Sequence, residues 1–405
     1  MKFYLFVLGC QMNLNDSERL RFLLTNLGLK ETDDQKEADV ILVVACSVRQ
    51  KPIDRIWGKL KVWRLATNNQ YLVLTGCVVE SDRKKFLEKF DFVFNVQEPQ
   101  KLVAFLKKKN LIAKNSAKIE SFFALNSMRQ TRERAYIAIG NGCNNFCTYC
   151  VVPYTRGREI YRSVKEILTE VKLALKNGAR RAEPSQHPLG GAKIISLIAQ
   201  NVNSYKDPSF VILNESEESR THARTDIRRR LPRRPLAGGL PRNDNLKNDF
   251  VDLLEKINAL SGDFKIEFLT SHPKDMSDEL IQAVAKLDKV IKWIHLPVQA
   301  GSNEILEKMN RKYTREHYLN LIKKIRAVIP KVFLTTDIIV GFPSESKKDF
   351  AETVSLVKIC QFDQAFISPY SPRFGTVAFK MEDNVLTLEK KRRFQILDKL
   401  INKVS

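Results

Sequence analysis

The sequence predicts a mixed α/β protein, in which an N-terminal parallel α/β sheet domain precedes a full or partial β/α barrel. Short apolar runs alternate with amphipathic stretches along most of the chain. Such repeated alternation implies parallel strands covered by helices on both faces. The 405 residues are enough for two or three domains, at roughly 150 residues each. A hydrophobic content of 43% supports sizeable cores and excludes wholesale disorder.

The first predicted domain covers residues 1–112. Its apolar runs, such as VILVVA and YLVLT, are typical of buried parallel strands. We expect strands at 2–8, 40–45, 71–75 and 92–96, and helices at 16–27, 51–65, 81–90 and 99–109. Asn15 or Asp16 is expected to cap the first helix, because short polar side chains accept hydrogen bonds from unpaired backbone amides.

Polar residues 113–134 form the predicted linker, and residues 135–385 form the predicted barrel domain. We expect strands at 135–139, 194–199, 265–269, 290–294, 332–340 and 364–367, and helices at 164–176, 278–285, 302–309, 314–328 and 349–359. About six strand–helix units indicate a full or partial β/α barrel and not an open dinucleotide-binding sheet. Residues 386–405 form a basic C-terminal segment, with a helix expected at 386–401.

Two polar segments rich in Pro, Gly and Arg interrupt the barrel pattern, at about 180–192 and 206–248. Neither shows apolar periodicity, so we interpret both as surface insertions. The second contains a basic run at 228–234. An arm that contacts RNA is the alternative interpretation of that run.

Charge and cysteine content narrow the class of protein. The chain has 68 Lys and Arg against 46 Asp and Glu, a net charge of +22, which favours a polyanionic partner such as nucleic acid. No uninterrupted apolar run approaches the ~20 residues that span a bilayer, so an integral membrane protein is excluded. Seven cysteines are too sparse and too odd in number for a disulfide scaffold, which favours cytosolic cysteines that bind metal or do chemistry.

One group of cysteines is local. Cys143, Cys147 and Cys150 lie in GNGCNNFCTYC, with C-x3-C-x2-C spacing, after the first predicted barrel strand. Three thiolates on one short loop can ligate three irons of a 4Fe–4S cluster and leave the fourth iron open. Zinc normally takes four ligands, and His187 in the first insertion is a poor fourth. The C-terminal end of a barrel strand is also where such barrels place their active sites.

A second group of cysteines is dispersed. Cys10, Cys46 and Cys77 each follow a predicted strand of the first domain, in LFVLGC, ILVVAC and YLVLTGC. Because the carboxyl ends of parallel strands meet at one edge of a sheet, these residues are expected to converge there. Three thiols in register favour a second metal cluster with an open iron. The remaining cysteine, Cys360, lies in an apolar helical stretch and is expected in the core.

At this point the motifs resemble those of the radical-SAM methylthiotransferase family. GCNNFCTYCVVPYTRGRE (142–159) resembles the family's cluster loop, and GCQMNLNDSE (9–18), CSVRQKPIDRIWGKL (46–60) and GC (76–77) resemble its N-terminal motifs. QNVNSY, SHPKDMSDEL, HLPVQAGSNEILEKMNRKYTREHY and TTDIIVGFPSE resemble the later part. The resemblance covers almost the whole chain apart from the insertions. The residues after Gly9 and around the cysteine loop are most similar to the subfamily that acts on dimethylallyl-adenosine.

The resemblance implies two 4Fe–4S clusters and S-adenosylmethionine (SAM) as cofactors. Cys143, Cys147 and Cys150 would hold the cluster that binds and cleaves SAM. Cys10, Cys46 and Cys77 would hold an auxiliary cluster that carries sulfur. The six cysteines are therefore the expected catalytic and metal-binding residues, and the two clusters are expected to face each other across the domain boundary.

The implied reaction is methylthiolation of carbon 2 of N(6)-dimethylallyladenosine at position 37 of tRNA, with radical SAM chemistry, sulfur insertion and SAM-dependent methyl transfer. The implied partners are tRNA, a flavodoxin- or ferredoxin-type electron donor and a sulfur donor. The protein would be a cytoplasmic monomer without membrane attachment. Two alternatives remain open: a threonylcarbamoyl-adenosine methylthiotransferase, and a catalytically impaired iron–sulfur RNA-binding protein.

Further residues lie in the cysteine loop, or in or shortly after predicted barrel strands, and are expected to bind cofactor or substrate: Tyr149, Gln200, Asn201, His295, Gln299, Asp337 and Gly341. Tyr149 would pack on the adenine of SAM, with ordinary core packing as the alternative. A structural role is the alternative for His295. Gly341 would let backbone approach the cofactor. Arg156 and Arg158 would meet phosphate or a carboxylate, or else be solvated.

The chain departs from the family pattern in three ways. The small β-barrel RNA-binding domain that usually follows the last helix has no counterpart here, so it is expected to be absent. Ser344 stands where the family usually has glycine. The two insertions flank the strand that ends at Gln200 and Asn201, where they could shield or disturb the site.

Overall fold

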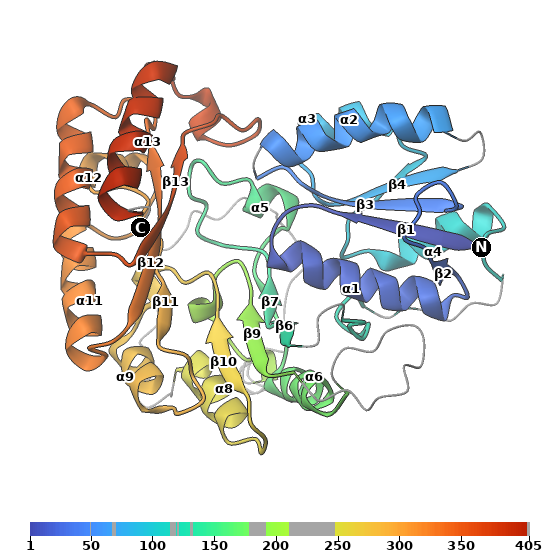
Figure 1. The fold of residues 1–405 in the computed structure, drawn as a ribbon, viewed down its shortest axis with the longest axis horizontal. Helices are drawn as coiled ribbons and strands as arrows, with labels where there is room; N and C mark the ends of the chain where they lie inside the picture. Colours follow the sequence, from blue (N-terminus) through green and yellow to red (C-terminus); the bar gives the residue numbers. More distant parts are fainter. Residues whose placement is uncertain are drawn as a thin grey trace, which may run out of the picture.

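The computed structural model describes residues 1–48, 50–66, 70–113, 119, 121–129, 133–177, 192–209 and 248–402. It shows two α/β units that lie side by side (Figure 1). The expected insertions at 180–192 and 206–248 lie outside these residues, apart from residues 192, 206–209 and 248. His187 and the basic run at 228–234 are also outside them.

The first unit contains a five-stranded parallel sheet with strand order β2-β1-β3-β4-β5. Its strands are β1 (Lys2–Val7), β2 (Lys30–Glu31), β3 (Val40–Cys46), β4 (Tyr71–Cys77) and β5 (Phe92–Val93). Every residue of β3 is buried, because this central strand is covered on both faces. The expected strand at 92–96 is shorter than predicted, and the two-residue β2 is an addition at the sheet edge.

Helices cover both faces of this sheet, as the alternation predicts. They are α1 (Gln11–Asn26), α2 (Gln50–Ala66), α3 (Glu80–Leu87) and α4 (Pro99–Lys108). Apolar side chains of α1 and α4 form the core on one face, and those of α2 and α3 form the core on the other. In Figure 1, α2 and α3 lie above the sheet and α1 lies below it.

The expected start of the first helix was wrong. Helix α1 begins at Gln11, and Cys10, not Asn15 or Asp16, stands at the cap position. The polar residues that resemble a cap are buried inside the helix instead: Asn13, Asn15, Asp16, Ser17, Glu18 and Arg19. Tertiary contacts with the second unit satisfy several of these side chains, so the polar cluster does not end the helix.

The second unit contains two three-stranded parallel sheets, β10-β9-β6 and β11-β12-β13. Its strands are β6 (Arg134–Ala138), β9 (Ile194–Ile198), β10 (Lys265–Phe268), β11 (Trp293–His295), β12 (Phe333–Val340) and β13 (Gln364–Pro369). A parallel bridge between Ile266 and Val290 joins the two sheets. The six strands therefore follow one another in chain order, which confirms the partial β/α barrel. The strand expected at 290–294 begins later, because β11 starts at Trp293 and Val290 forms only the isolated bridge.

Helices and short connections surround the barrel strands. The α-helices are α5 (Val152–Thr155), α6 (Val164–Asn177), α8 (Asp249–Asn258), α9 (Asp278–Lys286), α10 (Asn303–Lys308), α11 (Arg315–Val328), α12 (Lys347–Cys360) and α13 (Thr387–Ile401). A two-stranded hairpin pairs β7 (Gly140–Asn141) with β8 (Ile160–Tyr161), and the 3-10 turns are η1 (Val202–Ser204), η2 (Pro273–Asp275) and η3 (Ala378–Lys380). Helix α8 is additional to the expected helices. Cys360 is buried in the barrel core, as predicted.

Asparagine side chains cover both edge strands of the partial barrel. Asn15 of α1 donates its side-chain amide to the carbonyl oxygen of Tyr136 in β6, at 2.9 Å. At the other edge, Asn402 after α13 accepts from the backbone N–H of Ala365 in β13 and donates to its carbonyl oxygen. Edge strands carry unpaired backbone groups, so these amides pair groups that a closed barrel would pair with another strand.

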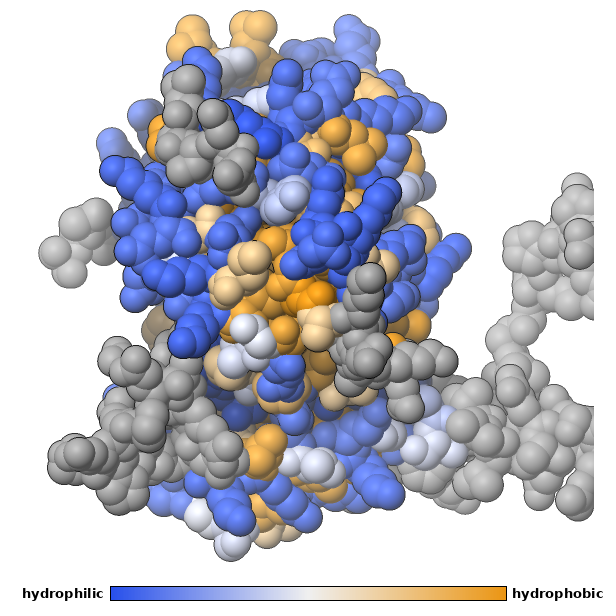
Figure 2. Space-filling model, turned by 90° about the vertical axis from the view of Figure 1, so that its right-hand side faces the viewer, coloured by the Kyte–Doolittle hydropathy of each residue, from blue (hydrophilic) through white to orange (hydrophobic). Residues whose placement is uncertain are grey.

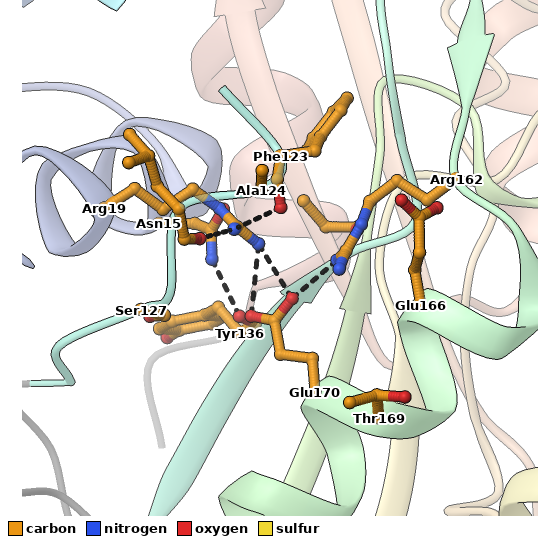
Figure 3. A network of polar contacts seen from close by, with 12 residues as sticks. Asn15, Arg19, Phe123, Ala124, Ser127, Tyr136, Arg162, Glu166, Thr169 and Glu170 are labelled. Carbon is orange, nitrogen blue, oxygen red and sulfur yellow. Dashed lines mark hydrogen bonds and ion pairs between the residues drawn. The ribbon is translucent and has the colours of Figure 1, made fainter. Parts of the chain in front are cut away.

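Buried charges join the two units (Figure 3). Arg19 of α1 binds both carboxylate oxygens of Glu170 in α6, at 3.1 and 2.8 Å. Arg162 donates to the same carboxylate at 2.6 Å, and Arg129 lies 3.7 Å from it. Arg19 also donates to the carbonyl oxygens of Phe123 and Leu125 in the segment between the units.

This network sets the charge of Glu170. Burial alone would raise the pKa of its carboxyl group, but attraction to Arg19, Arg162 and Arg129 outweighs burial and lowers the pKa to about 2. The carboxylate is therefore ionised wherever the protein is folded near neutral pH. Its negative charge is shared by three buried arginines, of which Arg129 is also attracted to Glu18.

The surface view shows the side of the molecule formed by the first unit (Figure 2). Hydrophilic residues cover most of this side and surround one hydrophobic area near its centre. Among the helices that the structure describes, none combines the length and the apolar composition that crossing a bilayer requires.

Replacement of Glu170 by Gln should destabilise the protein by roughly 3–5 kcal/mol, because it leaves buried arginines without their counter-charge. The native carboxyl has a lowered pKa, so its stabilisation is complete above its ordinary value of 4.5 and is lost as the pH falls toward about 2. Denaturant unfolding at several pH values should show that the variant lacks this acid-dependent loss.

Glu166→Gln on the same helix is the matched control. Its carboxylate accepts hydrogen bonds from the backbone and hydroxyl of Ser163, a role that glutamine can also fill. Its stability and pH profile should therefore stay close to those of the unmodified protein. Equal stability of the Glu170 and Glu166 variants would contradict the assigned role of the network.

Ser344 has a positive φ of 64°, in the left-handed region that favours glycine. A non-glycine residue there costs roughly 1–2 kcal/mol, and part of this is offset because glycine loses more chain entropy on folding. Ser344→Gly should therefore stabilise the protein by up to about 1 kcal/mol in denaturant unfolding. By contrast, Ser346→Ala should destabilise it by about 1 kcal/mol, because the Ser346 hydroxyl caps α12. Destabilisation by Ser344→Gly would contradict this account.

Candidate metal centres

The dispersed cysteines converge at one edge of the first sheet. Cys46 and Cys77 are the last residues of β3 and β4 and are register partners in the sheet. Cys10 follows β1 and stands at the cap of α1, and its neighbour Gly9 packs against Cys46. Cys46 and Cys77 are buried, whereas Cys10 is exposed. The structure therefore brings together three residues that lie up to 67 positions apart in the sequence.

Two glycines make this convergence possible. Gly9 and Gly76 precede Cys10 and Cys77 and have φ values of +119° and +101°, which side chains rarely tolerate. A Cβ atom on Gly9 would lie 2.7 Å from the Cβ of Cys46, and one on Gly76 would overlap the carbonyl oxygen of Ala45. The GC dipeptides of the sequence thus reflect close backbone packing beside the thiols.

Arg156 reaches this group of thiols from the second unit. Its Nε–H donates to the sulfur of Cys77 at 2.7 Å, and its terminal nitrogens pair with Asp16 at 2.6 Å and Asn13 at 2.8 Å. The guanidinium also donates to Asn141, two residues before Cys143, at 2.8 Å. Arg156 is 4% exposed. Of the alternatives that the sequence left open for it, the carboxylate partner is confirmed.

Burial governs the charge states at this edge. It raises the pKa of the Cys77 thiol to about 12, although the charge of Arg156 opposes the rise. For Arg156, burial would lower the pKa, but attraction to Asp16 and Cys77 raises it above its ordinary value. Thiols bind iron as thiolates, so cluster binding here would release protons.

The local cysteines lie on a loop that follows the β7 strand. Backbone hydrogen bonds from Cys143 to Gly157 and from Cys150 to Cys147 fix the loop internally. Thr148 donates from its amide to Met309 and from its hydroxyl to Lys308, and Asn310 donates to the carbonyl oxygens at residues 145 and 146. The end of α10 therefore holds the loop against the barrel.

A second buried arginine lies beside this loop. Arg311 donates to the sulfur of Cys147 at 3.4 Å, to the hydroxyl of Tyr313 at 2.9 Å and to the carbonyl oxygen of Pro297 at 2.8 Å. Tyr149 is partly buried against the barrel core, where burial raises the pKa of its hydroxyl. Its expected contact with adenine stays a prediction.

Unpaired acceptors at one strand end suit a polar ligand. Gln200 and Asn201 follow β9, and their side-chain oxygens are buried and have no hydrogen-bond partner among the described residues. The amide nitrogen of Asn201 donates to Asp275 at 2.7 Å, which fixes the orientation of that side chain. Buried acceptors are rarely left unsatisfied, so this strand end fits a ligand that donates hydrogen bonds.

The other expected cofactor residues have protein partners. His295 contacts Thr335 through Nδ1 at 3.0 Å and Asp337 through Nε2 at 3.3 Å. Both ring nitrogens therefore have partners within the protein, as a structural role would require. Gln299 has a φ of +69° and pairs through its backbone with β12. The site role of these residues, Asp337 included, stays a prediction.

The close neighbour of Gly341 is a side chain of the protein, although a cofactor was expected there. A Cβ atom there would overlap the aliphatic stem of Lys390 from α13, and its N–H donates to Glu345 at 2.6 Å. Its positive φ of 67° is thus explained by contacts within the protein. Its role toward a cofactor stays a prediction.

Each cysteine group supplies three thiols, a donor set that suits an iron–sulfur cluster. No set of three His, Cys, Asp or Glu side chains within the described ranges is arranged for a single metal ion. A 4Fe–4S cluster spreads its ligands over separate irons, so three thiols need not surround one point. Soft thiolates as the donor set also favour iron–sulfur chemistry over calcium or magnesium.

The segment from Asn141 to Arg156 connects the two cysteine groups. It carries the local cysteines, and its last residue contacts Cys77. The side-chain amide of Gln97, in the first unit, donates a hydrogen bond to the carbonyl oxygen of Arg156 at 3.0 Å. The roles of Asn13, Asp16 and Arg311 were not predicted from the sequence. Asn13 and Asp16 lie beside Cys10 in a polar run without amphipathic spacing, which was a signal, whereas Arg311 lies in a stretch without cysteine and gave none.

Two family models match the chain. Residues 2–97 match the family described as Uncharacterized protein family UPF0004. Residues 241–357 match the Radical SAM superfamily. The matches fall on the first unit and on the barrel, respectively.

Curated relatives cover nearly all of the chain. A tRNA-2-methylthio-N(6)-dimethylallyladenosine synthase of Thermoanaerobacter pseudethanolicus is 41% identical over 98% of this chain and 77% of its own length. Relatives of the same name from Clostridium botulinum (strain Loch Maree) and Carboxydothermus hydrogenoformans are 38% and 37% identical over 100% of this chain, and over 82% and 84% of their own lengths.

Solved structures share the fold at low identity. The radical SAM methyltransferase TsrM from Kitasatospora setae, with cobalamin and a [4Fe-4S] cluster bound, has a TM-score of 0.57 at 13% identity, over 93% of this chain and 77% of that one. The cobalamin-dependent SAM radical enzyme OxsB, in its apo form, has a TM-score of 0.54 at 12% identity, over 100% of this chain and 55% of that one. These likenesses concern the fold alone.

Gly76→Ala should remove the metal centre at Cys10, Cys46 and Cys77, because the added Cβ overlaps the Ala45 carbonyl and displaces the end of β4. After anaerobic reconstitution with iron and sulfide, we expect the variant to lose about half of the bound iron and to retain the centre on the cysteine loop. Full iron content would contradict the assigned packing.

Gly58→Ala is the matched control for this substitution. Gly58 lies in α2, and a Cβ atom there meets nothing within 4 Å. Alanine in a helix is more favourable than glycine by about 1 kcal/mol, so this variant should keep its full iron content and gain stability.

Proposed function

The chain belongs to the tRNA-2-methylthio-N(6)-dimethylallyladenosine synthase family, and we propose that it methylthiolates carbon 2 of N(6)-dimethylallyladenosine at position 37 of tRNA. Its class is that of the radical-SAM tRNA methylthiotransferases, whose cofactors are 4Fe–4S clusters and SAM. The resemblance seen in the sequence is thereby confirmed at the level of family and enzyme class. The modified base and the roles of individual residues are the proposal.

The reaction needs cofactor chemistry because the C–H bond at carbon 2 of adenine has no useful acidity. When bound, one cluster with SAM supplies the hydrogen abstraction and the other supplies sulfur, while SAM also provides the methyl group. We assign Cys143, Cys147 and Cys150 to the first cluster. Cys10, Cys46 and Cys77 are assigned to the second.

One observation carries this proposal: Arg156 links the two cysteine groups across the boundary between the units. Arg156 ends the segment that carries the local group and donates to the sulfur of Cys77. Its second contact, with Asn141, lies two residues from Cys143. A reaction that makes a radical at one centre and takes sulfur from another needs both centres near one substrate atom.

The protein's own groups bind and orient the reactants. The unpaired oxygens of Gln200 and Asn201 suit the amino or ammonium donors of SAM. Thr148 and the end of α10 hold the cysteine loop in place. His295 at the end of β11 and Asp337 within the neighbouring β12 form a polar pair, which we assign to substrate binding.

The charge of the chain supports tRNA as the partner. A net charge of +22 favours contact with phosphates through Lys and Arg. The electron donor is proposed to be of the flavodoxin or ferredoxin type, and a separate donor would renew the sulfur. We also propose that the protein acts as a cytoplasmic monomer.

Nucleoside mass spectrometry identifies the modified base. A strain that lacks its own methylthiotransferase would be complemented with this chain, and its tRNA digested and analysed. The proposal expects 2-methylthio-N(6)-dimethylallyladenosine. The methylthio form of threonylcarbamoyl-adenosine would instead support the sister activity, and no product together with no 5′-deoxyadenosine from the reconstituted protein would support the impaired iron–sulfur protein.

Variants of the two cysteine groups should fail in different ways. Cys147→Ala should abolish 5′-deoxyadenosine formation, whereas Cys46→Ala should retain it but yield no methylthiolated nucleoside. Both products can be quantified by mass spectrometry after anaerobic turnover with dithionite. The matched control is Cys360→Ala, which removes a buried thiol of the barrel core and should retain both products. Loss of SAM cleavage in the Cys46 variant would contradict the division of roles.

A further inference from the structure

We propose that Arg156 is a positioning residue that holds the auxiliary cluster and raises its reduction potential through its hydrogen bond to the sulfur of Cys77. This inference rests on the proposed assignment of Cys10, Cys46 and Cys77 as ligands of that cluster. It assigns to the barrel unit a residue that acts on a centre of the first unit.

The contacts fix the guanidinium on several sides. Its Nε–H points at Cys77, while its terminal nitrogens bind Asn141, Asn13 and Asp16. Arginine presents its donors in a rigid planar fork, so contacts from both units lock the plane of the group. With 4% of the residue exposed, water does not compete for these donors.

The position of the charge has a direct consequence for the cluster. Reduction adds negative charge to an iron–sulfur cluster, and its potential depends on net charge, hydrogen bonds to sulfur and solvent exposure. A buried cation that donates to a ligand sulfur stabilises the reduced form more than the oxidised form. Arg156 should therefore raise the potential, and its removal should lower it.

The arrangement also links the cluster to the docking of the two units. Arg156 follows α5 in the barrel unit, and Asp16 lies on α1 of the first unit. Any separation of the units would therefore move the guanidinium of Arg156 away from Cys77. The redox property of the auxiliary cluster thus depends on an intact boundary.

Arg162 provides a matched control on the same boundary. Arg156 and Arg162 are both buried, and each pairs with a buried carboxylate at 2.6 Å. Arg162, however, contacts Glu170 and the carbonyl oxygen of Ala138 in place of a cysteine sulfur. Both of these partners of Arg162 belong to the barrel unit, so its loss should remove a buried cation without withdrawing Arg156 from Cys77.

The experiment isolates the auxiliary cluster in the full chain. A background variant with Cys143, Cys147 and Cys150 changed to Ala would be reconstituted anaerobically with iron and sulfide. Redox titration followed by electron paramagnetic resonance would then give the midpoint potential. Three variants would be compared in this background at equal iron content per chain: Arg156→Gln, Arg156→Lys and Arg162→Gln.

We expect Arg156→Gln to shift the midpoint to lower potential by a tenfold change in the reduction equilibrium or more, which is about 59 mV for one electron. Arg156→Lys keeps the charge without the planar fork, so a smaller shift in the same direction is expected. Arg162→Gln should leave the potential unchanged. The Arg156→Lys variant retains a cation at this position. It therefore tests the inference even if Arg156→Gln prevents assembly of the cluster.

Three results would overturn the inference in distinguishable ways. Equal potentials for the background protein and both Arg156 variants would overturn the role of Arg156 and leave the ligand assignment intact. Absence of any cluster in the background protein, with Arg156 present, would overturn the ligand assignment and the inference together. A shift in Arg162→Gln as large as that in Arg156→Gln would assign the effect to the boundary in general.

Discussion

The burial of charged side chains between α1 and the barrel is the constraint on which the arrangement of this protein depends. Asp16 and Arg19 lie one turn apart on α1 and pair with Arg156 and Glu170 of the second unit. A buried charge without a partner is costly, so the two units can pack closely only where these pairs form. Ion pairs of this kind are weak evidence for stability, but they specify one docking geometry.

That docking geometry brings distant chemistry together. The first sheet presents its thiols at the carboxyl ends of β3 and β4, and the barrel presents its cysteine loop beyond β6 and β7. The same α1 contributes Asn13 and Asp16 to the guanidinium that touches Cys77. Helix α1 therefore borders the sheet edge that carries the dispersed cysteines and also forms the docking surface for the barrel.

The partial barrel is adapted to this docking. Its β6 edge lies against α1, where Asn15 pairs the Tyr136 carbonyl, and its β13 edge is paired by Asn402. Apolar contacts among Met12, Ala138 and Ile198 continue the same boundary. A barrel that ends in edge strands can accept a neighbouring domain beside its active end, whereas a closed barrel presents only loops there.

The sequence by itself determined most strands and helices, the six strands of the barrel and the positions of Cys10, Cys46 and Cys77 after strands of the first sheet, because periodicity and strand-end spacing are local properties. Tertiary structure decided where α1 begins, which partner Arg156 takes and why Gly341 has positive φ. Asn15 and Asp16 resemble a helix cap in sequence, yet Tyr136 and Arg156 satisfy them inside the helix. Such choices depend on groups far away in the sequence, whose placement only the folded chain defines.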